Sequence, residues 1–190
     1  DNSIIENPIE ILFFNTVEGN FTQCRNILVV GKNSEVKFIE KIQNIDCNSS
    51  FANHFTKIDC DRNSKVEYNK IQNNTYNSRL IDSMDIYQKE DSVCNINTLI
   101  FGGEFVRNNL YFEQNGTNSE SNMNGVSVLN NSQLVDNHTF VDHKSAYCRS
   151  NEMYKGVYLD KSKGVFNGKI MVRQDSQKID AFQANNNLLL

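Results

Sequence analysis

The chain has 190 residues, of which 38% are hydrophobic and 10% aromatic, and its formal net charge is -4. This length suits one sizeable domain or two small ones, and aliphatic and aromatic residues recur along the whole chain, unlike in a disordered segment. We therefore expect one elongated, folded unit. Basic residues are scattered among acidic ones, so nucleic-acid binding is not indicated.

The sequence shows no sign of membrane insertion or secretion. No stretch approaches the roughly 18 apolar residues that a membrane helix needs, and residues 1–10 lack the features of a secretory signal. The five cysteines are widely spaced, which predicts neither a disulfide framework nor a zinc finger. We therefore expect a cytoplasmic protein with reduced cysteines, and interpret the Asn-x-Ser/Thr sequons as chance matches in an Asn-rich chain.

Two segments in the first half of the chain align with each other. Residues 33–43 and 63–72 share the pattern Asn-Ser-x-Val, start 30 positions apart and differ by one deletion. A weaker copy begins at Asp91 and a further turn signal at Asn115, so the punctuation returns every 25 to 30 residues. Such a period is typical of a solenoid or a propeller-like array.

Apolar residues within these units recur at every second position, which predicts strands rather than helices. Examples are Val36 with Phe38, and Val126 with Val128. Pro8 is the only proline, so asparagine and glycine must make the bends, since both tolerate positive φ angles.

Short strands with Asn-rich corners favour an all-β fold, a parallel β-helix whose coils stack on one another and whose terminal coils need capping. A meander of antiparallel hairpins is the alternative, with Asn115-Gly116 as its best signal.

Two glycine pairs, Gly102-Gly103 and Gly164 with Gly168, do not fit any phosphate-binding loop. We expect them to allow a tight turn or a close approach of neighbouring coils.

A histidine- and cysteine-containing stretch, with Asp136 and Asp142 beside it, is a possible iron or zinc site. His138, His143 and Cys148 follow one another at intervals of five, and an odd interval sends successive strand side chains to opposite faces. We therefore expect polar corner residues with backbone partners and a buried structural cysteine, and assign no metal ligand.

The set Asp136, Asp142, Asp160 and Lys155 is similar to the acid-base groups of a β-helix polysaccharide lyase or glycosidase. Paired carboxylates need a defined separation across a cleft, which sequence spacing in a solenoid does not set. We expect solvated surface acids and assign no catalytic residue.

Four blocks in the last third resemble the SufD family, a subunit of the SUF iron-sulfur cluster assembly scaffold. They are residues 136–143, 150–156, 164–170 and 177–190, and a weaker fit extends upstream through residues 101–107. The related SufB family would carry Tyr-Arg-Gly where this chain has Phe166-Asn-Gly, and Cys-Asp-Ser where it has Ala184-Asn-Asn-Asn.

The resemblance implies a right-handed parallel β-helix, with residues 1–190 as a single core domain lacking the family's N-terminal helical region and C-terminal cap. It also implies a non-catalytic scaffold subunit that pairs with a SufB-like paralogue and a SufC-like ABC ATPase. An iron-sulfur cluster would be held transiently at the interface. The family's cluster-building cysteine and histidine belong to a block beyond Leu190, so we carry over no cofactor-binding residue.

The abrupt end at Leu188-Leu-Leu, together with the N-terminal helical region that the resemblance implies is missing, leads us to expect a β-helix truncated at both ends. Expressed alone, it would self-associate through its strand edges. The alternative function is that of a β-helix polysaccharide lyase or surface adhesin, which the same fold would permit.

Overall fold

The computed structural model describes residues 1–190 and consists of strands joined by turns. No helix long and apolar enough to cross a membrane is present. The strands are β1 (Ile9–Asn15), β2 (Asn20–Val30), β3 (Glu35–Asn44), β4 (Ser50–Cys60), β5 (Lys65–Asn73), β6 (Arg79–Gln88), β7 (Val93–Phe101), β8 (Phe105–Gln114), β9 (Glu120–Leu129), β10 (Leu134–His143), β11 (Arg149–Tyr158), β12 (Lys163–Val172) and β13 (Asp180–Leu189).

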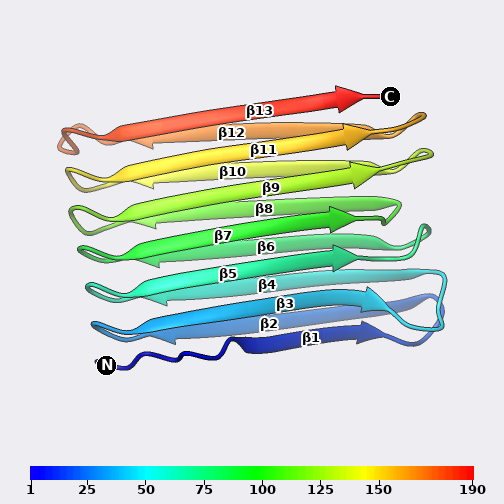
Figure 1. The fold of residues 1–190 in the computed structure, drawn as a ribbon, viewed down its shortest axis with the longest axis horizontal. Coiled ribbons are helices and arrows are strands. Elements are labelled where there is room, and N and C mark those ends of the chain that lie inside the picture. The colour runs from blue at the N-terminus through cyan, green and yellow to red at the C-terminus, as the bar shows by residue number, and fades with distance from the viewer.

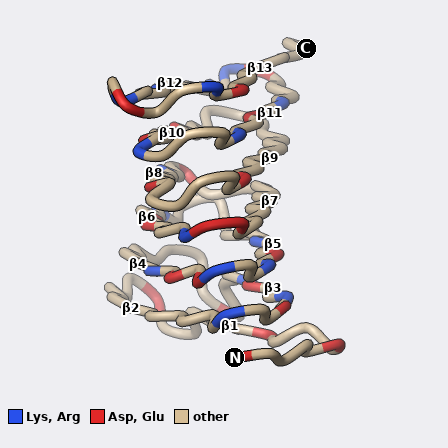
Figure 2. Tube along the Cα trace, turned by 90° about the vertical axis from the view of Figure 1, so that its left-hand side faces the viewer, with Lys and Arg blue, Asp and Glu red and all other residues tan.

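The strands form a parallel β-helix of about six turns, with two strands in each turn. The odd-numbered strands make a seven-stranded sheet and the even-numbered strands a six-stranded sheet, which we call the odd-strand and even-strand sheets. Figure 1 shows the odd-numbered strands in front and a right-handed coil that climbs from the N-terminus to the C-terminus. Figure 2 shows the two stacks edge-on, with acidic and basic residues interspersed along them. The predicted β-helix is confirmed, and the antiparallel meander is wrong because consecutive strands lie in different sheets and every pairing is parallel.

The sequence repeat corresponds to one turn of the coil. Residues paired in adjacent turns lie between 26 positions apart, as in Arg79 with Phe105, and 31 apart, as in Arg149 with Asp180. In the first repeat the offset stays at 30 from β3 to β5, so the one-residue deletion in the sequence alignment is wrong. The backbone hydrogen bonds between β3 and β5 set this register, whereas the sequence alignment matches identical residues.

Asparagine makes many of the bends, as predicted, and glycine makes some, but aspartate, which was not predicted, takes the same role at several others. Successive corners place Asn33, Asn63, Asp91 and Asn118 at φ angles of 55°, 54°, 60° and 58°. Their short side chains also link the turns: Asn63 Nδ2 donates to Asn33 Oδ1 at 3.0 Å, and Asn118 Nδ2 to Asp91 Oδ1 at 2.8 Å. Each of these side chains therefore stabilises its corner in two ways. It tolerates the left-handed φ region, and it forms a hydrogen bond with the corner of an adjacent turn.

The two predicted glycine pairs have different roles. Gly102 and Gly103 have φ angles of 94° and 86° and make a tight turn between β7 and β8. Gly164 lies in β12 instead, where a β-carbon would come within 2.0 Å of the Tyr158 hydroxyl, so it makes room for a side chain of the preceding strand.

Inward-facing side chains of the two sheets form two apolar clusters. One contains sixteen residues, including Ile86 and Phe112, and the other contains eight, including Leu80 and Leu129. Burying each such side chain contributes about 1.5–3 kcal/mol. A row of polar side chains separates the clusters, and it contains the charges described below.

Candidate functional site

The predicted metal-ligand residues do not come together. His138 lies inside β10 on the outer face of the even-strand sheet, where its Nε2 is 2.8 Å from Asp136 Oδ1. The other oxygen of Asp136 accepts a hydrogen bond from Arg107 Nη1 at 2.7 Å. The expected corner position is therefore wrong for His138, since it lies within a strand and its partner is a side chain.

His143 and Cys148 are both buried. His143 ends β10 on the inner face, 3.1 Å from Ser150 Oγ, and burial lowers the pKa of its imidazole. Cys148 occupies the next corner, where its thiol donates to the Gly116 carbonyl at 3.3 Å, so the expected buried structural cysteine is confirmed. No cluster of three or more His, Cys, Asp or Glu side chains suited to a metal ion occurs in residues 1–190. The odd spacing in β10 has sent the two histidines to opposite faces.

The predicted acid-base set is also dispersed. Asp142 forms a two-pronged ion pair with Arg173, at 2.8 and 2.7 Å, which holds the pKa of Asp142 below its ordinary value. Asp160 lies at a corner and accepts a hydrogen bond from the backbone of Asn131, while Lys155 lies exposed on the odd-strand sheet. These groups stand on different parts of the surface, so no catalytic pair forms, although Asp142 is covered rather than solvated as expected.

The strongest feature of the interior is a group of buried charges that the sequence reading missed. We call it the interior charge cluster; it consists of Glu40, His54, Tyr68, Lys70 and Asp82. Lys70 from β5 and Asp82 from β6 form an ion pair across the two sheets, with side-chain exposures of 3% and 1%. Tyr68 donates a 2.5 Å hydrogen bond to Glu40 Oε2. Buried ion pairs stabilise poorly compared with apolar packing, so such a cluster is a candidate functional feature.

The cluster holds one carboxyl group with a strongly perturbed affinity for protons. The pKa of Glu40 is raised to about 7, chiefly by burial; Asp82 adds to the rise, while Lys70 and the Tyr68 hydroxyl oppose it. Burial also lowers the pKa of His54, whose Nδ1 has no hydrogen-bond partner. Near neutral pH the cluster can therefore take up or release a proton at Glu40, while His54 stays neutral.

A row of amides continues from the cluster along the inside of the coil. Gln72 Nε2 donates to Asp82 Oδ2 at 2.9 Å and to Asn108 Oδ1 at 2.8 Å. Asn108 in turn donates to Asn137 in the next turn at 3.0 Å. These bonds link side chains of β5, β6, β8 and β10, and so tie together three successive turns of the coil.

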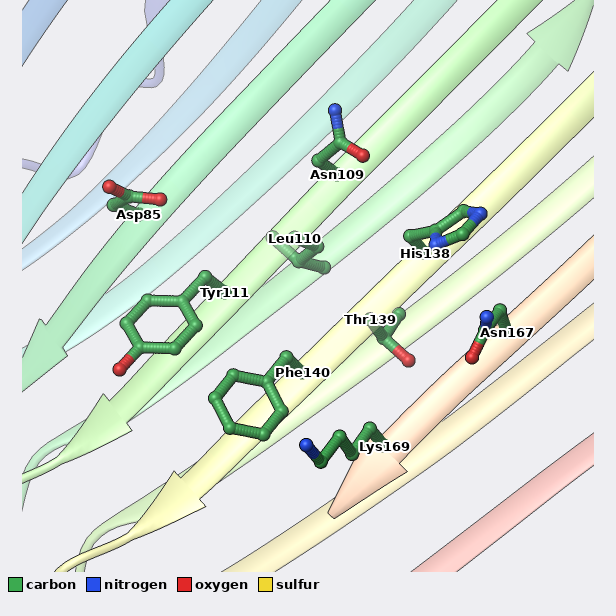
Figure 3. Close-up of a pocket in the computed structure, with 9 residues that line it drawn as sticks. All are labelled: Asp85, Asn109, Leu110, Tyr111, His138, Thr139, Phe140, Asn167 and Lys169. Carbon is green, nitrogen blue, oxygen red and sulfur yellow. The ribbon is translucent and has the colours of Figure 1, made fainter. Parts of the chain in front are cut away.

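A second candidate site is a trough of about 410 Å³ on the outer face of the even-strand sheet. Figure 3 shows the rings of Tyr111 and Phe140 side by side with their faces toward the viewer, and the ring centroids are 5.2 Å apart. Nine residues line the trough: Asp85, Asn109, Leu110, Tyr111, His138, Thr139, Phe140, Asn167 and Lys169. Its mixed charges and amides could bind a polar ligand by hydrogen bonds.

Comparison with known proteins gives a consistent result. Residues 13–190 match the family model described as SUF system FeS cluster assembly, SufBD core domain. The chain is 27% identical to the iron-sulfur cluster assembly protein SufD of Escherichia coli over 173 residues, which is 91% of this chain and 41% of that protein. It is 25% identical to an iron-sulfur cluster assembly SufBD family protein of Synechocystis over 199 residues, 100% of this chain and 44% of that protein.

A plastid relative extends the comparison. The chloroplastic protein ABCI7 of Arabidopsis thaliana is 22% identical over 197 residues, 98% of this chain and 41% of that protein. The chain thus spans less than half the length of each of these relatives.

Proposed function

The chain belongs to the SufBD core domain family of the SUF iron-sulfur cluster assembly system and is SufD-like, and we propose from this that it serves as a non-catalytic scaffold subunit. The observation that carries the proposal is the match of residues 13–190, nearly the whole β-helix, to that family. The fold supports a scaffold role, because its turns are linked by continuous backbone ladders and by side-chain bonds between turns.

We propose that the subunit works with a SufB-like paralogue and a SufC-like ABC ATPase in the cytoplasm. The iron-sulfur cluster is then cargo, handled at an interface between subunits. His138, His143 and Cys148 are not proposed as its ligands, since a carboxylate, a serine and backbone carbonyls respectively already occupy them.

Affinity purification of the tagged full-length protein from its native cells tests the proposal. Mass spectrometry should find a SufB-like paralogue and an ABC-type ATPase in near-equal amounts, with an unrelated β-helix protein carrying the same tag as the control. Absence of any ATPase, together with cleavage of acidic glycans by the purified protein, would overturn the proposal in favour of a β-helix lyase.

A further inference from the structure

The outer face of the odd-strand sheet carries exposed apolar side chains in two adjacent columns. Val126 and Val128 are examples. Their alternation in the sequence correctly predicts a strand, and both side chains face solvent, with exposures of 37% and 39%. Leu99 and Phe101 on the neighbouring strand have exposures of 36% and 39%. We call the whole set, which includes the half-buried Ile71 and Val157, the apolar patch; it consists of Ile71, Leu99 and Val126 in one column and Phe101, Val128 and Val157 in the next.

Lysines bound the first column at both ends, whereas the second column continues from Val157 to the exposed Leu188 of β13. The first column begins at Lys41, which pairs with Ile71, and ends at Lys155, which pairs with Val126. Neither lysine forms an ion pair with a carboxylate, although ten such bridges form elsewhere in the chain. A ladder of asparagines runs along the side of the patch, with Asn97 donating to Asn69 and Asn124 donating to Asn97, both at 2.9 Å.

We propose that the apolar patch is a docking surface for an amphipathic helix of a partner protein, with acidic residues at both ends of that helix. The dimensions fit. The two columns are two residues apart along the strands, or about 6.6 Å, which one apolar helix face of about 10 Å can cover. Lys41 and Lys155 are four strand spacings apart, about 19 Å, which corresponds to about 13 helical residues.

Charge argues against a second copy of this chain as the occupant. A symmetric dimer through the patch has its two-fold axis in the plane between the sheets. If that axis runs parallel to the column, Lys41 of one copy lies opposite Lys41 of the other copy. If the axis runs perpendicular to the column, Lys41 of one copy lies opposite Lys155 of the other. Both arrangements oppose like charges, whereas carboxylates at the helix ends would pair with both lysines.

A synthetic 14-residue helical peptide tests the inference. The peptide has leucines along one face and two glutamates at each end, and the control peptide has lysines at the ends. Fluorescence anisotropy with the purified full-length protein should show the glutamate peptide binding about tenfold more tightly, because two weak ion pairs replace two weak repulsions. The Lys41→Glu/Lys155→Glu variant should reverse this preference.

Two further variants separate the outcomes. Val126→Lys, within the patch, should weaken binding of the glutamate peptide at least tenfold, whereas Val29→Lys, exposed on the even-strand sheet, should leave it unchanged. Equal affinity for the two peptides, or no binding of either, would overturn the proposal. Self-association of the protein that Val126→Lys abolishes, without peptide binding, would also overturn it and assign the patch to a second copy.

Discussion

Replacing Glu40 by glutamine removes a buried ionisable group with little change in size, so Glu40→Gln should remove a pH dependence of stability that the native protein has. In the folded protein the pKa of Glu40 is raised from 4.5 to about 7, first by burial. Between these pH values the folded state keeps a proton that the unfolded chain has released. The free energy of unfolding therefore falls as pH rises through this window and is constant above it.

The size of the effect follows from the shift. The rise of the Glu40 pKa from 4.5 to about 7 corresponds to about 3 kcal/mol at most. Glutamine resembles the protonated carboxyl group, so Glu40→Gln should become up to about 3 kcal/mol more stable relative to the native protein between pH 4.5 and pH 8. His54 has a lowered pKa, so below its ordinary pKa it makes the free energy of unfolding rise with pH, which is the opposite slope. This contribution is present in both proteins and cancels in the difference between them.

Urea unfolding followed by circular dichroism at pH 5 to 8.5 measures this difference. The exposed Glu6 provides the control, since Glu6→Gln should leave the pH profile of the native protein unchanged. If Glu40→Gln and the native protein keep the same slope across the window, then Glu40 does not hold a proton in the interior and the reasoning is refuted.

Four other single substitutions test the packing and the turns. Lys70→Met leaves the buried carboxylate of Asp82 without its cation and should lower the free energy of unfolding by about 3–5 kcal/mol in chemical unfolding. The double variant Lys70→Met/Asp82→Leu should recover most of this loss. A double variant as unstable as the single one would contradict this. Gly102→Ala, at a φ of 94° with a backbone oxygen 2.4 Å from the new β-carbon, should cost more than about 2 kcal/mol. Gly19→Ala, at a φ of 66° in open space, should cost only about 1 kcal/mol, and equal losses in thermal melts would argue against the turn geometry. Phe112→Ala should cost about 3–5 kcal/mol, and a loss below 1 kcal/mol would show that its cluster is not close-packed.

The fold could be predicted because its signals are local. Alternating apolar residues mark strands, and asparagine supplies at several bends the positive φ that a corner needs, as at Asn33 and Asn63. The exact register could not be read this way, because the pairing of Ile42 with Gln72 depends on the hydrogen-bond ladder rather than on residue likeness.

The interior charge cluster was only partly within reach. Glu40 alternates with Phe38 and Ile42 on the inner face of β3, so the period of two already indicates that a carboxyl group is buried. Its neighbours Lys70 and Asp82 come from opposite sheets, and only the stacking of the coils brings them together. Sequence spacing likewise assigned the two histidines of β10 to opposite faces but could not tell a corner from a strand.

The most direct test of the scaffold role is the cluster content of the assembled complex. The SufB-like paralogue and the ABC-type ATPase would be produced with and without the full-length form of this protein, and iron and acid-labile sulfide would be measured in each purified sample. If the subunit is a scaffold, the cluster content should fall sharply when it is left out and return when it is restored. Equal amounts of iron and sulfide with and without the subunit would contradict the scaffold role.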